Sequence, residues 1–326
     1  MRFGVRSLPT GVVRLSVVAG MVLISSPAFA GFVINPTFTA NFNTNFGANA
    51  AAAQASWIAA ANIFTSAFTD NITVNVTVDA TAGTTPFGQS NTFLVTSSWA
   101  ALQAAVVADA KSNNDFTAIG PGGSIPLTDP TGGTGTWKVT RAEAKALGII
   151  PSDGVTDGTT TFGAGNPFTF SGAIAAGTYD FQGVAAHEIS EVLGRLGLGG
   201  VGNSYSLVDA FSFSGPGTRV LGNGGGSGLQ GSFSINKGTN LLKLYNNQAA
   251  NGLDYRDWAP GTNDAFNQFS GSSVVNPVSA VDLQELDVIG YDLAAPEPST
   301  LILLGSALVV AGLIRRRDRS RFNRRS

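Results

Sequence analysis

The two ends of the chain restrict the part that can fold into a globular domain. Residues 1–30 hold three arginines, an apolar run at residues 15–24 and the small-residue pattern Ala28-Phe29-Ala30. This order predicts a secretory signal peptide, which a signal peptidase removes after Ala30. The run is shorter than the ~20 apolar residues that span a bilayer, and the alternative is a membrane anchor that stays in place. We therefore expect the folded body to begin near Gly31.

The other end carries a second apolar segment, followed by basic residues. Pro296-Glu297-Pro298 precedes an apolar run at residues 301–314, and Arg315-Arg316-Arg317 comes next. This three-part pattern resembles the PEP-CTERM sorting signal of Gram-negative bacteria. The resemblance implies that an exosortase-type membrane protease removes the tail and delivers the body to the cell surface and its extracellular polysaccharide matrix. Until then the apolar run is expected to hold the precursor in the membrane, with the arginines on the cytoplasmic side. The alternative is a permanent tail anchor that spans the membrane once.

The predicted body, residues 31–295, is acidic and has no cysteine. It contains nine of the 19 basic residues and nineteen of the 21 acidic residues, so its formal charge is 9 − 19 = −10. This charge disfavours nucleic acid and anionic lipid as partners. Without cysteine, neither disulfides nor thiol chemistry can contribute. The length of the body allows one domain with a sizeable core.

Hydrophobic periodicity predicts both helices and strands in this body. Apolar residues recur with helical spacing in three segments, residues 48–68, 98–111 and 279–288. Polar and apolar residues alternate over residues 72–78, which is typical of a half-buried strand. Residues 158–170 are expected to form a hairpin-like pair of strands, and residues 120–135 a loop rich in Pro and Gly. Thr140 and Glu143 form a capping-box pattern at the start of a short helix. The fold class is therefore α+β.

The stretch His187-Glu188-Ile189-Ser190-Glu191 contains the only histidine of the chain. We expect it on a helix that begins after Asp180 and ends near Gly194 or Gly197, where His187 and Glu191 project from one face, one turn apart. The stretch is similar to His-Glu-x-x-His, in which two such side chains bind zinc and the glutamate is the general base. Because glutamate is also a zinc ligand, the motif predicts His187 and Glu191 as ligands and Glu188 as the base.

Arg195 offers a different role for Glu191. It follows Glu191 by four residues, in the order that favours an ion pair on a helix. If this pair forms, the helix is a structural element and the metal site is empty.

Four longer segments extend the similarity beyond the motif: residues 181–195, 203–219, 252–270 and 278–292. Together they resemble a family of PEP-CTERM-tagged metalloproteases, which residues 67–80 and 87–90 also fit. The resemblance implies a metzincin-like fold, with a twisted sheet over an active-site helix, an edge strand beside the cleft and a smaller irregular C-terminal lobe. It also implies a peptide or protein substrate that is hydrolysed by metal-activated water.

The sequence departs from the metzincin pattern after the helix. Gly194 matches the turn glycine, but Gly197 takes the position of the third ligand and has no side chain. A methionine turn is absent from the body, because the only methionines are Met1 and Met21. We predict Asp209 as the third ligand, since the chain should return beneath the helix there. The alternative for Asp209 is an aspartate that caps a turn.

Two further groups of acidic residues have weaker interpretations. The first is in a Gly/Asn-rich stretch, where it could bind calcium or form Asx turns; it consists of Asp254, Asp257 and Asp264. The second is expected on a solvated helix face; it consists of Asp282, Glu285 and Asp287. Three functions follow: an exported zinc metalloendopeptidase, a catalytically silent surface or matrix protein with the same fold, and a calcium-stabilised adhesive module.

Overall fold

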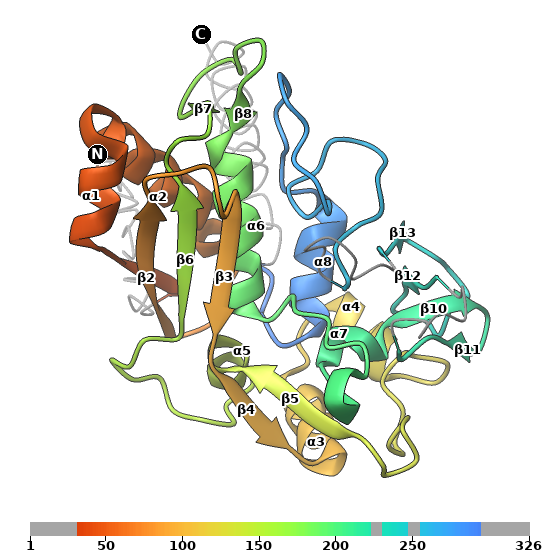
Figure 1. Cartoon of the computed structure of the whole chain (residues 1–326). Helices are drawn as coiled ribbons and strands as arrows, with labels where there is room; N and C mark the ends of the chain where they lie inside the picture. The colour runs from red at the N-terminus through yellow and green to blue at the C-terminus, as the bar shows by residue number, and fades with distance from the viewer. Residues whose placement is uncertain (1–30, 223–229, 247–254, 295–326) are drawn as a thin grey trace, which may run out of the picture.

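The computed structural model describes residues 31–222, 230–246 and 255–294 (Figure 1). The predicted cleavage residues Ala28 and Ala30 and the motif Pro296-Glu297-Pro298 lie outside these ranges. Within the described ranges, no helix has both the length and the apolar composition needed to cross a bilayer. The elements are of mixed α and β type, which agrees with the predicted α+β class.

The first half of the body is built on a mixed sheet. Its strands, in spatial order, are β1 (Val33–Phe38), β2 (Thr73–Thr81), β6 (Gly158–Gly163) and β3 (Gly88–Thr92). The first three strands are parallel, and β3 runs antiparallel to β6 at the edge. The predicted alternation is confirmed in β2, where Val74, Val76 and Val78 are buried and their neighbours are half-exposed. One face of the sheet therefore packs on other elements.

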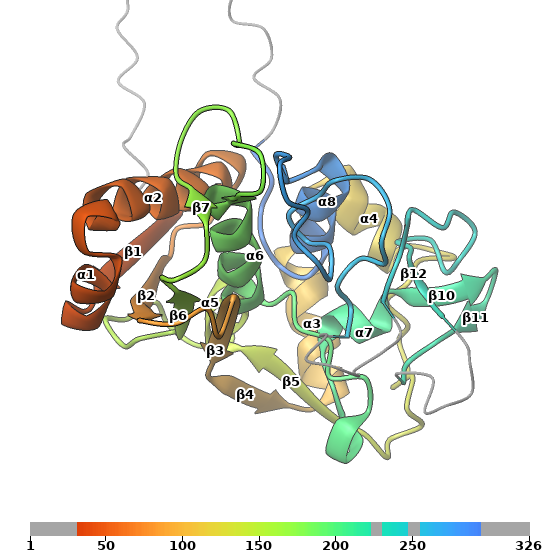
Figure 2. The same cartoon turned by 45° about the horizontal axis from the view of Figure 1, so that its top comes forward.

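Helices cover that face: α1 (Ala40–Phe46), α2 (Ala50–Ala67) and α6 (Phe181–Leu193). The helix predicted over residues 48–68 is confirmed as α2, whose buried Trp57 donates its indole N–H to Thr160 of β6 at 3.1 Å. α6 packs against α2, β6 and β3. Figures 1 and 2 show α6 in the middle of the molecule, between the sheet and a second lobe.

The rest of the molecule, which includes the second lobe, is built of short elements. Its strands form two further sheets: β4 (Leu94–Ser97), β5 (Thr136–Thr140) and β9 (Ser204–Tyr205) in one, and β11 (Thr218–Arg219), β10 (Ser212–Gly215), β12 (Ser232–Phe233) and β13 (Lys243–Leu244) in the other. Its helices are α3 (Trp99–Asp109), α4 (Asn113–Ile119), α5 (Arg141–Ala146), α7 (Leu207–Ala210) and α8 (Ala280–Val288). Figures 1 and 2 place α8, α4 and the β10–β13 sheet across α6 from the main sheet.

Most of the remaining predicted elements are confirmed, and the hairpin is not. The helices expected at residues 98–111 and 279–288 are α3 and α8, and the capping box of Thr140 and Glu143 opens α5. The hairpin predicted for residues 158–170 is wrong. β6 already has strands on both sides, and β7 (Phe168–Thr169) pairs instead with β8 (Tyr179–Asp180).

The acidic side chains of α8 do not face solvent, contrary to expectation. Asp282, Glu285 and Asp287 are all buried. The Asp282 carboxylate accepts the indole N–H of Trp258 at 2.7 Å, and Glu285 accepts the hydroxyl of Tyr245. Burial raises the pKa of Glu285 to about 8, even though Tyr245 lowers it. A charged carboxylate on this buried face of α8 is therefore favourable only where a hydrogen-bond donor or a cation compensates for its burial.

The pKa of Glu285 is higher in the folded protein, about 8, than its ordinary value of 4.5. The free energy of unfolding therefore decreases as the pH rises through this interval, because the unfolded chain loses its proton first. Glu285→Gln removes this titration and keeps an acceptor for Tyr245. We predict that the variant gains a few kcal/mol relative to wild type between about pH 5 and about pH 8.5. Urea unfolding at both pH values measures the difference. A difference that does not change with pH would contradict this prediction.

Candidate metal centre

α6 has the boundaries that the sequence predicts. Asp180 is its N-cap residue, and Gly194 ends it with φ 128°, a conformation that favours glycine. The carboxylate of Asp180 does not cap the helix and accepts the N–H of Asn276 at 2.9 Å. This bond ties the start of α6 to residues 255–294, which we call the C-terminal lobe.

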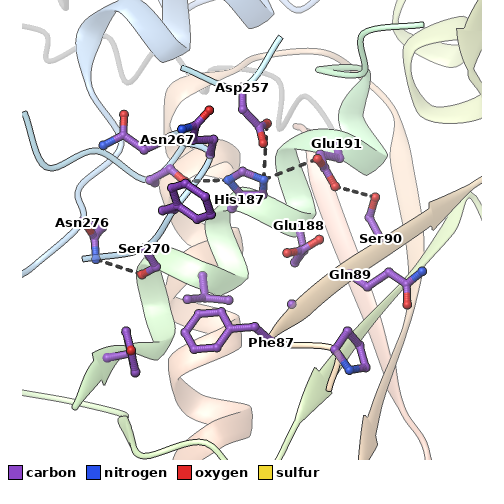
Figure 3. A pocket seen from close by; sticks show the side chains of 18 of the residues that line it. Phe87, Gln89, Ser90, His187, Glu188, Glu191, Asp257, Asn267, Ser270 and Asn276 are labelled. Carbon is purple, nitrogen blue, oxygen red and sulfur yellow. Dashed lines mark hydrogen bonds and ion pairs between the residues drawn. The ribbon is translucent and has the colours of Figure 1, made fainter. Parts of the chain in front are cut away.

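A cleft of about 730 Å³ lies along α6, and His187, Glu188 and Glu191 line it. The segment from Pro86 to Ser90 forms one wall, and residues of the C-terminal lobe form the other (Figure 3). Glu188 fits beside β3 because residue 88 is glycine: a Cβ atom at Gly88 would lie 2.3 Å from Glu188 Oε1. The helix motif, the edge strand and the C-terminal lobe thus meet at one cleft.

His187 is oriented by a backbone carbonyl group. Its Nδ1 lies 2.9 Å from the carbonyl oxygen of Ala265, which can only accept, so Nδ1 carries a hydrogen. Nε2 faces two carboxylates, at 3.4 Å from Glu191 Oε1 and 3.5 Å from Asp257 Oδ1. In metal sites, a histidine ligand is typically held in this way through its other ring nitrogen. Figure 3 shows the three side chains converging.

Asp209, the predicted third ligand, is not part of this group. Its Oδ2 accepts backbone N–H groups of the loop after α6, from Leu198, Gly199 and Ser206. Its Oδ1 accepts the Nε–H of Arg256 at 2.8 Å. Asp209 is fully buried and braces the loop, as the turn-capping alternative expects. Within the described residues, the group of at least three His, Asp or Glu side chains suited to a metal is His187, Glu191 and Asp257.

Gly197 explains how Asp257 reaches the site. A Cβ atom at Gly197 would lie 2.4 Å from the carbonyl oxygen of Tyr255 and 2.3 Å from Arg256 Cγ. The segment at Tyr255 and Arg256 therefore passes directly against Gly197, and Asp257 follows in the same segment. The signal in the sequence for this close approach is Gly197 itself, because a residue without a side chain leaves space for another segment of the chain.

The charged groups of the site shift one another's pKa values. Burial lowers the pKa of His187, but the carboxylates of Asp257 and Glu191 raise it to about 10. Burial raises the pKa of Glu191, and His187 and Arg195 lower it to about 2. Glu188 has its pKa raised by burial and by the charge of Glu191. The negative field that attracts a proton to His187 would equally attract a metal cation.

Two of the three separations among the candidate ligand atoms have the length expected around a zinc ion. Zinc binds nitrogen and oxygen at about 2.0–2.2 Å in a tetrahedron, so neighbouring ligand atoms lie about 3.3–3.6 Å apart. The separations of 3.4 and 3.5 Å around Nε2 match this range. Glu191 Oε2 accepts the hydroxyl of Ser90 at 2.7 Å, whereas Oε1 is buried and accepts no hydrogen bond from the described residues. One nitrogen and two carboxylate oxygens thus lie within 4.8 Å of one another.

The residues considered for calcium have separate roles. Asp257 belongs to the group around His187, and Asp264 pairs with Lys243 and accepts the N–H of Phe266 at 2.8 Å. The latter contact is the Asx turn that the sequence suggested. Asp254 lies outside the described residues.

Comparisons with known proteins give no relative for this chain. No family model matches it, no curated protein matches it, and no solved structure matches it. The interpretation of the site therefore depends on its own geometry.

The contact at Gly197 leads to a prediction for metal binding. In Gly197→Ala the new methyl group must displace the backbone at Tyr255, and Asp257 moves with it. We predict weaker zinc binding in a zinc titration and a loss of about 1–3 kcal/mol of stability. Gly154→Ala is the control, because a Cβ atom there meets nothing within 4 Å. Unchanged zinc affinity in Gly197→Ala would contradict the role given to this contact.

Proposed function

We propose that this protein is an exported zinc metallopeptidase in which His187, Glu191 and Asp257 hold the metal. The observation that carries the proposal is the spacing of the three ligand atoms around His187 Nε2, at 3.4 Å from Glu191 and 3.5 Å from Asp257. This spacing fits zinc, and His-Glu-x-x-Glu on a helix supplies two of the ligands in the order of a metallopeptidase motif.

The residues of the cleft have distinct roles in this proposal. A bound zinc ion would act as a Lewis acid and make a water molecule more acidic. Glu188 lines the same cleft one residue after His187, and it accepts the proton of the attacking water as general base. His187 is held by Ala265, so it stays in the orientation that metal binding needs.

The arrangement of elements supports a metzincin-like fold as the finer classification. β3 lies antiparallel at the sheet edge and packs against α6, and the cleft runs between β3 and an irregular C-terminal lobe. An extended peptide or protein segment is the substrate class for such a cleft. In the same proposal, a signal peptidase and an exosortase-type protease process the two ends, and the body serves at the cell surface or in its polysaccharide matrix.

A second function, a catalytically silent surface protein, is favoured by one observation. Arg195 Nη1 donates to Asp257 Oδ1 at 2.6 Å, and Nη2 lies 3.6 Å from Glu191 Oε1. The carboxylates are therefore partly neutralised by protein groups alone. In this alternative the polar network of α6 has a structural role and no substrate is cleaved.

Two matched substitutions test the ligand assignment. Asp257→Asn and Asp209→Asn each break a buried Asp–Arg pair, and both should lower stability by about 3–5 kcal/mol. Only Asp257→Asn should also weaken zinc binding. The loss should exceed the ~10–100-fold expected for a residue that contacts a metal ligand but not the metal itself. His187→Ala should abolish zinc binding, because the chain has one histidine. Zinc titration of the folded proteins measures this, and equal affinities for all variants would place the metal elsewhere.

Glu188→Gln tests the general base. The amide keeps the shape of the side chain but cannot accept the proton of water. We predict that cleavage of an unfolded protein substrate falls by ~10²–10⁴-fold, while zinc content is unchanged. A wild-type protein that binds zinc and cleaves no member of a broad peptide library would favour the silent alternative.

A further inference from the structure

Arg195 is a buried cation directly behind the candidate ligands. It follows the left-handed Gly194, and its side chain is fully buried beneath α6. Its Nε donates to Ser190 Oγ at 2.8 Å, and its guanidinium lies 4.5 Å from the centre of the Phe266 ring. These contacts fix the guanidinium from two sides.

The position of the Asp257 carboxylate depends on this arginine. Arg195 Nη1 donates to Asp257 Oδ1 at 2.6 Å. The same oxygen atom lies 3.5 Å from His187 Nε2. Because Asp257 comes from a loop of the C-terminal lobe and not from α6, no helical spacing holds it at the site.

Arg195 also balances charge around the other ligand. Glu188, Glu191 and Asp257 are three buried carboxylates that line one cleft. Nη2 of Arg195 lies 3.6 Å from Glu191 Oε1, while the Ser90 hydroxyl donates to Oε2. Burying like charges together is unfavourable unless an opposite charge is close. A planar fork can contact Ser190, Asp257 and Glu191 at once, whereas a lysine presents one nitrogen.

We propose that Arg195 is a positioning residue of the metal centre: it holds Asp257 against His187 and Glu191, so that the three ligands converge before the metal binds. This inference rests on the proposed zinc site. It assigns to Arg195 a role different from the helical ion pair with Glu191 that the sequence suggested, since Asp257 is its closer partner. Removing the guanidinium frees Asp257 to rotate away from His187 and Glu191.

Zinc affinity in Arg195→Met and Arg195→Lys tests the proposal. We expect Arg195→Met to bind zinc ~10–100-fold more weakly than wild type, as for other lost contacts to a metal ligand. Arg195→Lys keeps the buried charge and should fold, with an affinity between the two. Kd is measured by competition with a zinc chelator on folded protein. Cobalt substitution adds a second readout, because loss of one ligand changes the visible absorption of the bound ion.

Lys145→Met is the matched control. Lys145 is fully buried and pairs with the equally buried Asp157 at 2.6 Å, and neither residue lines the cleft. This variant should lose stability as Arg195→Met does, yet keep the zinc affinity and cobalt spectrum of wild type.

The outcomes separate the inference from the proposed function. A wild-type protein that binds no zinc overturns both. A wild-type protein that binds zinc, with Arg195→Met binding it equally well or more tightly, overturns only the inference, because the guanidinium would then compete with the metal for Asp257. Weakened binding in Lys145→Met to the same degree would also overturn it, since the effect would then reflect general loss of stability.

Discussion

The structure depends on the mutual neutralisation of charges buried along α6. His187, Glu188, Glu191 and Arg195 lie within or directly after one helix, and that helix packs between the main sheet and the second lobe. Such side chains are rarely buried unless they are paired. Asp257 supplies the missing partner from a distant segment, so the C-terminal lobe completes the charge balance as well as the cleft. A helix of this composition would be poorly accommodated in the core without that lobe.

Close backbone approach at two glycines makes this arrangement possible. Gly88 lets the edge strand pass against Glu188, and Gly197 lets the segment before Asp257 pass against the end of α6. A Cβ atom at Gly88 would overlap the Glu188 carboxylate, and one at Gly197 would overlap the Tyr255 backbone and the Arg256 side chain. The lack of a side chain at residue 197 is therefore a structural requirement for Asp257 to reach His187.

Local patterns in the sequence predicted the local structure well. The stripe around Trp57, the alternation in β2 and the capping box before α5 each depend on neighbouring residues, and each is found as predicted. The positions of His187 and Glu191 also followed from helical spacing alone. The sequence pointed to Asp209 and did not place Asp257 beside His187, because tertiary packing and not helical spacing brings Asp257 to this position. The buried acids of α8 were missed for the same reason: Trp258 and Tyr245, which bind them, are far away in the sequence.

The most direct test is anomalous diffraction at the zinc absorption edge from crystals of the purified protein soaked with zinc. We predict one strong peak bounded by His187 Nε2, Glu191 Oε1 and a carboxylate oxygen of Asp257, with Arg195 still bound to Asp257. Crystals with no peak at this point, or with the metal on Asp209 instead, would contradict the assignment of the cleft as a metal centre.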